Sequence, residues 1–159
     1  MTPESATSVV LIRILLPKAE IVPLGMDADA TLLIGDAALR SAFEDPTPHF
    51  DLGRVWLERT GMPMVFAVWA ARTAAVAAHA DRLERLGDII RGASRRHATD
   101  PEPLVQAAAE RFPFPADFIR HYFTRLSYDF GDAERAGLRT FFERAHDAGE
   151  LHGTGVAVG

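Results

Sequence analysis

Met64-Val65-Phe66-Ala67-Val68-Trp69-Ala70-Ala71 is the longest apolar run bounded by clear breaks in this sequence. It follows the breaker Gly61-Met62-Pro63 and ends at the charged residue Arg72. A short, continuous apolar run between turn residues is typical of a strand that is buried on both faces of a sheet. We therefore predict a central strand at residues 64–71.

The residues before this run alternate between short elements, which is typical of an α/β fold. Two further strands are predicted at Glu20–Leu24 and Ala30–Ile34, and a helix is predicted from Asp51 to Thr60, ended by Gly61. Val9–Leu16 is rich in β-branched residues and is compatible with a strand. The Ser and Thr residues before it favour a capped helix instead.

From Thr73 onward the sequence predicts only helices, and Pro, Asp or Gly residues mark where they begin. The predicted helices are Ala74–Arg96, Pro101–Arg111, Pro115–Leu126 and Asp132–Ala148. The last one carries an apolar stripe, formed by Leu138, Phe141, Phe142 and Ala145, and Gly149 follows as its C-terminal cap. An apolar stripe must face another apolar surface. The four helices could pack as a bundle, but we expect a further sheet to receive them.

Composition excludes several classes of function. The chain has 159 residues, of which 48% are hydrophobic and 25% charged, as in an ordinary globular domain. Its net charge of -5 argues against a nucleic-acid partner, and no apolar run approaches the ~20 residues that span a bilayer, so we predict no membrane partner and a cytoplasmic location. The chain has no cysteine and its six histidines lack metal-ligand spacing, so we predict no metal site.

A hydroxyl-rich turn, Thr2-Pro3-Glu4-Ser5-Ala6-Thr7-Ser8, leads into the first predicted helix. The unpaired amides and the dipole of a helix N-terminus favour a carboxylate or phosphate there, so Ser5, Thr7 and Ser8 are candidate ligand contacts. An ordinary helix cap explains the same residues. Gly35-Asp36 follows a predicted strand, at the edge where α/β sheets present ligand sites, although a turn that caps a helix from Ala37 explains this pair equally well.

Three segments, taken in order, carry a family resemblance: the Ser/Thr turn, Leu33-Ile34-Gly35-Asp36-Ala37-Ala38-Leu39, and the stretch from Asp51-Leu52-Gly53 to Ala70. The tail agrees, with Leu126-Ser127-Tyr128-Asp129-Phe130-Gly131. Together they resemble the chorismate dehydratases of the futalosine route to menaquinone. The block from Gly61 to Ala70 is the most specific part of this resemblance.

The resemblance implies an α/β, periplasmic-binding-protein-like (type 2) fold with two lobes and a substrate cleft between them. Residues 1–72 would form the second lobe, and residues 73–159 would be a helical segment that returns to the first lobe. The N-terminal part of that first lobe is not in this sequence. Met64–Ala71 would then cross between the lobes, and the stretch Leu16–Ala30 is shorter than in the family.

The implied activity is that of a lyase, which dehydrates chorismate to 3-[(1-carboxyvinyl)oxy]benzoate without a cofactor. Ser5, Thr7 and Ser8 would seat one carboxylate of chorismate, and Gly35 and Asp36 would line the same cleft. Asp36 would orient the substrate or a water, while the acid and base stay unassigned. Two alternatives remain open: a one-lobe module that binds a small carboxylate without catalysis, and a chain that self-associates through exposed helix faces.

Overall fold

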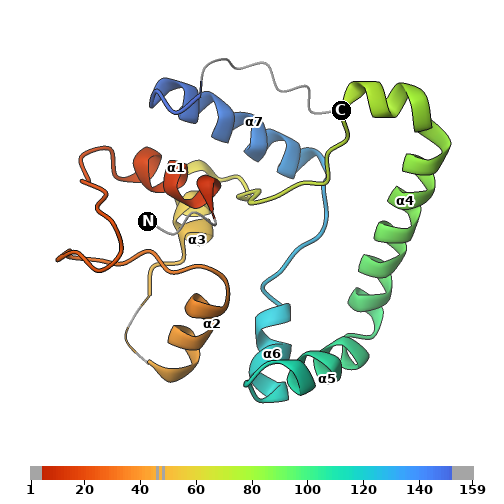
Figure 1. The fold of residues 1–159 in the computed structure, drawn as a ribbon, viewed down its shortest axis with the longest axis horizontal. Coiled ribbons are helices and arrows are strands. Elements are labelled where there is room, and N and C mark those ends of the chain that lie inside the picture. The colour runs from red at the N-terminus through yellow and green to blue at the C-terminus, as the bar shows by residue number, and fades with distance from the viewer. Residues whose placement is uncertain (1–4, 46, 48, 152–159) are drawn as a thin grey trace. The chain divides into compact units, whose positions relative to one another are not determined.

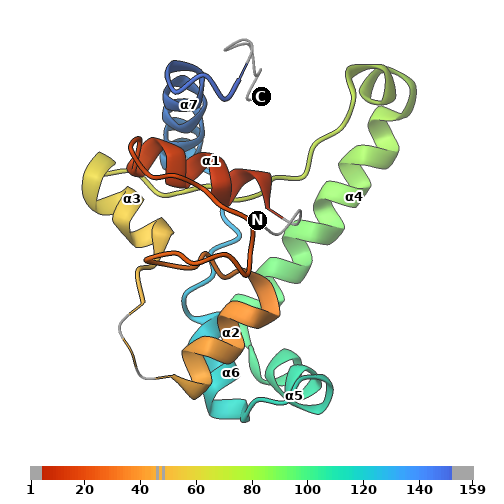
Figure 2. The same cartoon turned by 60° about the vertical axis from the view of Figure 1, so that its left-hand side comes forward.

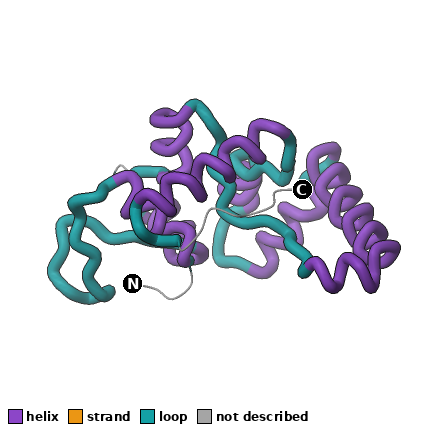
Figure 3. The backbone as a smooth tube through the Cα atoms, turned by 90° about the horizontal axis from the view of Figure 1, so that it is seen from above, coloured by secondary structure: helices purple, strands orange, loops and turns teal. Residues whose placement is uncertain are grey.

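The computed structural model describes residues 5–45, 47 and 49–151. These residues form α1 (Ala6–Leu15), α2 (Gly35–Glu44), α3 (Leu52–Thr60), α4 (Thr73–Thr99), α5 (Glu102–Arg111), α6 (Ala116–Phe123) and α7 (Asp132–Asp147). Figure 3 shows these helices joined by long loops, with no strand in the described part of the chain.

The chain divides into two compact units, which we describe separately. The first contains residues 1–67 and 129–159, and the second contains residues 68–128. The division into lobes at residue 72 stays a prediction, because compactness alone does not assign a segment to a lobe.

The core of the first unit lies where α1 packs against α3 and α7 (Figure 1). Its buried side chains are Leu11, Leu15, Trp56 and Phe141. The edge of one aromatic ring meets the face of the other, with the Trp56 and Phe141 centroids 6.0 Å apart at 69°.

The predicted cap signals are confirmed for α3, where Asp51 accepts a hydrogen bond from the Arg54 amide and Gly61 adopts a left-handed conformation with φ 71°.

The predicted apolar stripe of α7 is confirmed. Leu138, Phe141 and Ala145 are buried, and Phe142 packs against the core. A Cβ atom built on Gly137 would lie 2.2 Å from the carbonyl oxygen of Pro63, so only glycine permits this approach of α7 to the Pro63 backbone. Gly149 ends the helix with φ 76°, as expected for a glycine cap.

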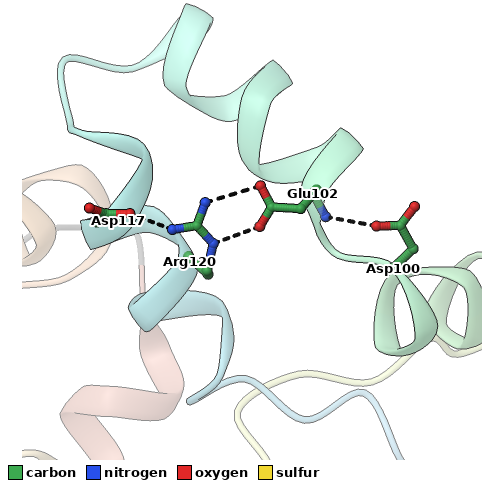
Figure 4. A network of polar contacts seen from close by, with 4 residues as sticks. All are labelled: Asp100, Glu102, Asp117 and Arg120. Atoms are coloured by element: carbon green, nitrogen blue, oxygen red, sulfur yellow. Dashed lines mark hydrogen bonds and ion pairs between the residues drawn. The ribbon is translucent and has the colours of Figure 1, made fainter.

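The second unit is built around the pair α5 and α6, which bury Val105 and Ile119 together with Phe114 of the loop between them. Arg120 of α6 joins the two helices through both oxygens of Glu102, at 2.6 and 3.0 Å, and also pairs with Asp117 (Figure 4). The Asp100 carboxylate accepts a hydrogen bond from the Glu102 amide at 3.3 Å. The Arg120 hydrogen bond lowers the pKa of Glu102 below its ordinary value. We interpret this exposed network as a set of ion pairs and hydrogen bonds that stabilises the packing of α5 against α6.

No residue of the 27-residue helix α4 is buried. His79 breaks its regular geometry with φ -141° and ψ 33°, so the uninterrupted helix runs from residue 80. Near its other end the His97 ring meets the rings of Phe123 and Tyr128 edge to face, with centroids 5.2 and 6.3 Å away. These contacts hold the C-terminal part of α4 against the segment around residues 123–128.

The strands predicted at Glu20–Leu24, Ala30–Ile34 and Met64–Ala71 are wrong for this structure. Their backbones are extended or irregular, and the described residues provide no strand that could pair with them. The expected burial of the 64–71 run is wrong as well, because Phe66, Val68 and Trp69 are 47%, 49% and 83% exposed. Apolar content gives a segment the tendency to form a strand, but a sheet requires a hydrogen-bonded neighbour.

The fold class is therefore confirmed only in part. The helices predicted from residue 73 onward are present, but the described residues contain no strand, so the two-lobed α/β arrangement stays a proposal. Within the described ranges, no helix combines the length and the hydropathy that a bilayer crossing requires.

Candidate functional site

The first candidate region is the beginning of α1, where the predicted capped helix is confirmed. Ser5 is the N-cap residue, and its hydroxyl oxygen accepts a hydrogen bond from the Ser8 amide at 3.2 Å. The same hydroxyl donates to the Ser8 hydroxyl oxygen at 2.8 Å. Ser8 is only 6% exposed. The hydroxyl of Ser5 thus bonds both the amide and the hydroxyl of Ser8, and these contacts stabilise the helix start.

The donors that remain at this helix end belong to other groups. The amides of Ala6 and Thr7 are first-turn donors without a helical acceptor, and neither has another partner among the described residues. The half-buried Thr7 hydroxyl has no hydrogen-bond partner in the described ranges either. The first turn of α1 contains no acidic residue that would neutralise its dipole. These two amides and one hydroxyl can therefore donate hydrogen bonds to a bound anion. The remaining residues of the predicted turn, Thr2, Pro3 and Glu4, lie outside the described residues.

The second candidate region is the beginning of α2. The helix starts at Gly35, two residues before the expected start at Ala37. Gly35 has φ 57°, which L side chains rarely adopt, so a glycine is required where the extended segment turns into the helix. Asp36 lies in the first turn, where a carboxylate interacts favourably with the helix dipole. It is exposed and forms no hydrogen bond or ion pair with any other described residue.

The two helix starts belong to the same compact unit. Figures 1 and 2 both place the first turn of α2 directly below the N-terminal end of α1. No hydrogen bond joins them, because Ser5 and Ser8 bond to each other and Asp36 is unpaired in the described part of the chain. The structure thus brings the two candidate regions to one side of the unit without a direct contact.

The sequence predicted unpaired amides at this helix start but did not identify the residues that carry them. It singled out the hydroxyls of Ser5, Thr7 and Ser8, whereas the unpaired donors include the amides of Ala6 and Thr7. A serine at the N-cap position could have indicated them, because it fixes which amides precede the first helical hydrogen bond. Among the described residues, no three His, Asp or Glu side chains gather into a candidate metal site.

Comparison with known proteins adds to this geometry. The sequence model of a family described as "Menaquinone biosynthesis" matches residues 1–147, nearly the whole chain. The chain belongs to this family. A relative named chorismate dehydratase, from Thermus thermophilus, is 32% identical over 169 aligned positions, which cover 90% of this chain and 60% of that protein.

Two other relatives share a smaller part of their length with this family member. A chorismate dehydratase of Campylobacter jejuni is 38% identical over 65 residues, which are 41% of this chain and 24% of that protein. A 1,4-dihydroxy-6-naphtoate synthase of Streptomyces coelicolor is 30% identical over 141 residues, which are 83% of this chain and 48% of that protein. The chain thus spans about three fifths of the Thermus relative and less of the other two.

The Thermus alignment contains gaps in this chain. Ninety per cent of 159 residues is about 143, so about 26 of the 169 aligned positions have no residue here. This deficit is compatible with the short stretch between Leu16 and Ala30. The position of the missing residues remains a prediction.

Proposed function

We propose that this chain carries part or all of a chorismate dehydratase, a lyase of menaquinone biosynthesis. The observation that carries the proposal is the family match over residues 1–147, together with a 32% identical relative named chorismate dehydratase over 90% of the chain. The naphtoate synthase is 30% identical over a shorter share of this chain. The chain spans only three fifths of the first relative, so the activity of the whole protein is part of the proposal.

The reaction removes one molecule of water from chorismate. A ring C–H bond and the ring C–O bond to the hydroxyl break, and the electron pair of the C–H bond enters the ring, which becomes aromatic. A base accepts the ring proton and an acid protonates the departing hydroxyl, giving water and 3-[(1-carboxyvinyl)oxy]benzoate. Aromatisation drives the step, and we propose that no cofactor takes part.

The beginning of α1 is the proposed seat for one of the two carboxylates of chorismate. Thr7 would donate its amide and its hydroxyl, and Ala6 would donate its amide. Ser5 and Ser8 would act mainly by fixing this turn, because their hydroxyls are engaged with each other. Charge-assisted hydrogen bonds from helix amides to a carboxylate are stronger than those to neutral acceptors.

Gly35 and Asp36 would line the same cleft from the beginning of α2. The absence of described partners leaves the Asp36 carboxylate available to accept a hydrogen bond from the substrate hydroxyl or from a water. A cleft between two lobes, and the cytoplasm as the place of the reaction, belong to the proposal as well.

The test is incubation of the purified chain with chorismate, followed by chromatographic detection of 3-[(1-carboxyvinyl)oxy]benzoate. A protein-free sample controls for spontaneous decay of chorismate, and a Thr7→Val variant tests the carboxylate seat. We expect product from the unaltered chain and less product from the variant. Absence of product from folded protein would refute the proposal for this chain alone.

Calorimetry on the same samples measures chorismate binding and so distinguishes an enzyme from a binding module without catalysis. Chorismate binding without turnover would favour the module, and Thr7→Val would then weaken binding while the melting temperature stays unchanged.

Self-association through exposed helix faces also stays a proposal. It would appear as a sedimentation coefficient that rises with protein concentration and does not respond to chorismate.

A further inference from the structure

One face of α4 is exposed along its uninterrupted part. Its members are spaced four, three, four and three residues apart, so they form a single stripe on the helix. This α4 stripe consists of Arg82, Leu86, Ile89, Ala93 and Arg96. Leu86 is 45% exposed and Ile89 is 66% exposed. Two large apolar side chains therefore face outward between two arginines.

The positive and negative side chains of α4 lie on different sides of the helix. Arg82 and Arg96 end the stripe, Arg85 adjoins it, and none of the three forms an ion pair with another described residue. The carboxylates of the same helix lie away from the stripe, and one of them, Asp88, pairs with Arg91 at 2.7 Å. The exposed apolar pair is thus bordered by uncompensated positive charge.

The charge of the surrounding unit agrees with this local pattern. Residues 68–128 contain nine arginines and seven carboxylates, a net charge of +2, whereas the whole chain has a net charge of -5. The second unit is thus the positive part of an otherwise acidic chain. Such asymmetry indicates attraction of this unit to an anionic surface.

We propose that the α4 stripe docks on an anionic lipid bilayer surface. Leu86 and Ile89 would enter the boundary between headgroups and acyl chains, and the arginines would contact the phosphates. Helices that lie in a membrane interface combine an apolar face with Lys or Arg at its borders. This contact is peripheral and revises the expectation that the chain has no membrane partner.

The pattern disfavours a second copy of α4 as the occupant. The four-three spacing is that of a coiled-coil seam, but two antiparallel copies would oppose Arg82 with Arg96, and two parallel copies would oppose each arginine with itself. The seam is also only two heptads long, shorter than a stable coiled coil usually needs. A nucleic acid would gain nothing from Leu86 and Ile89, and the stripe contains no aromatic residue for stacking on bases.

The test is sedimentation of the full chain with vesicles of phosphatidylcholine alone and with vesicles that contain equal amounts of phosphatidylglycerol. We expect binding only to the anionic vesicles, weakened by added salt. Each arginine near such a surface contributes about fivefold in affinity, so Arg82→Gln with Arg96→Gln should weaken binding about 25-fold. Ile89→Asn should weaken it about tenfold through the lost apolar contact.

The matched control is Arg95→Gln, which removes the same charge about 100° around the helix from Arg96. We expect it to weaken binding less than about threefold, because screening reduces the effect of a charge on the far side. Failure to bind anionic vesicles would overturn the proposal, as would equal losses in the control and in Arg82→Gln. Self-association abolished by Leu86→Glu would overturn it as well, and would assign the stripe to a second copy.

Discussion

Replacing Gly137 by alanine tests the packing of α7 directly. The added Cβ would lie 2.2 Å from the Pro63 carbonyl oxygen and 3.3 Å from the Pro63 carbonyl carbon. An ordinary contact is 3.4 Å or longer, so α7 and the Pro63 backbone must separate by about 1 Å. This displacement would also strain the buried contacts of Leu138 and Phe141. Overpacking of this kind costs about 3 kcal/mol where the obstacle is backbone.

Alanine regains about 1 kcal/mol of helix propensity, which leaves a net destabilisation of about 2 kcal/mol. For a chain of this length that corresponds to a melting temperature roughly 4–8 °C lower. Urea and thermal unfolding followed by circular dichroism would measure both quantities. The control is Gly92→Ala in α4, where the nearest atom to the new Cβ is the Arg96 Nη1 at 3.5 Å. We expect this control to be stabilised by up to about 1 kcal/mol, and an equally stable Gly137→Ala would refute the close approach.

Three further changes test the site and the second unit. Ser5→Ala removes the α1 cap and should lower stability by about 1 kcal/mol in urea unfolding, and an unchanged midpoint would contradict its capping role. Asp36→Ala should weaken chorismate binding about tenfold and cost no more than about 1 kcal/mol of stability through the lost helix-dipole interaction. Equal affinity by calorimetry would exclude Asp36 from the site. Because Arg120 lowers the pKa of Glu102 below its ordinary 4.5, that interaction stabilises the protein above this value and is lost as the pH falls through the lowered pKa. Arg120→Gln should therefore flatten the fall of the urea midpoint as the pH drops through 4.5 and then through the lowered pKa, and an unaltered slope would show that other groups cause it.

Local sequence signals predicted the helices well. Asp51 and Gly61 bracket α3 as expected, and Ser5 caps α1 although the Val-rich run after it was compatible with a strand. These signals act within one or two turns of the chain, so they can be read from neighbouring residues. The prediction of a helix after Gly35 was right, but its start was two residues late, because the left-handed conformation of Gly35 is part of the turn.

The candidate site was predicted only at the level of the region. The Ser/Thr turn pointed to the start of α1. The structure then divided its hydroxyls into a mutually bonded pair, Ser5 and Ser8, and that of Thr7, which has no partner among the described residues. That division depends on side-chain rotation and burial, which residue type does not encode. Backbone amides are present in every residue, so those of Ala6 and Thr7 can be singled out from the sequence only once Ser5 is taken as the N-cap residue.

The two tryptophans show why the strands were predicted wrongly. Trp56 and Trp69 both lie in apolar surroundings in the sequence, yet Trp56 is 0% exposed and Trp69 is 83% exposed. Trp56 finds Phe141 from a distant helix, whereas Trp69 belongs to an extended segment without a neighbouring strand in the described residues. Burial of a large apolar side chain is worth about 1.5–3 kcal/mol, so the exposed run represents stabilisation that has not been realised. An apolar pattern therefore predicts the tendency of a segment to be buried, while the presence of a partner surface decides whether burial occurs.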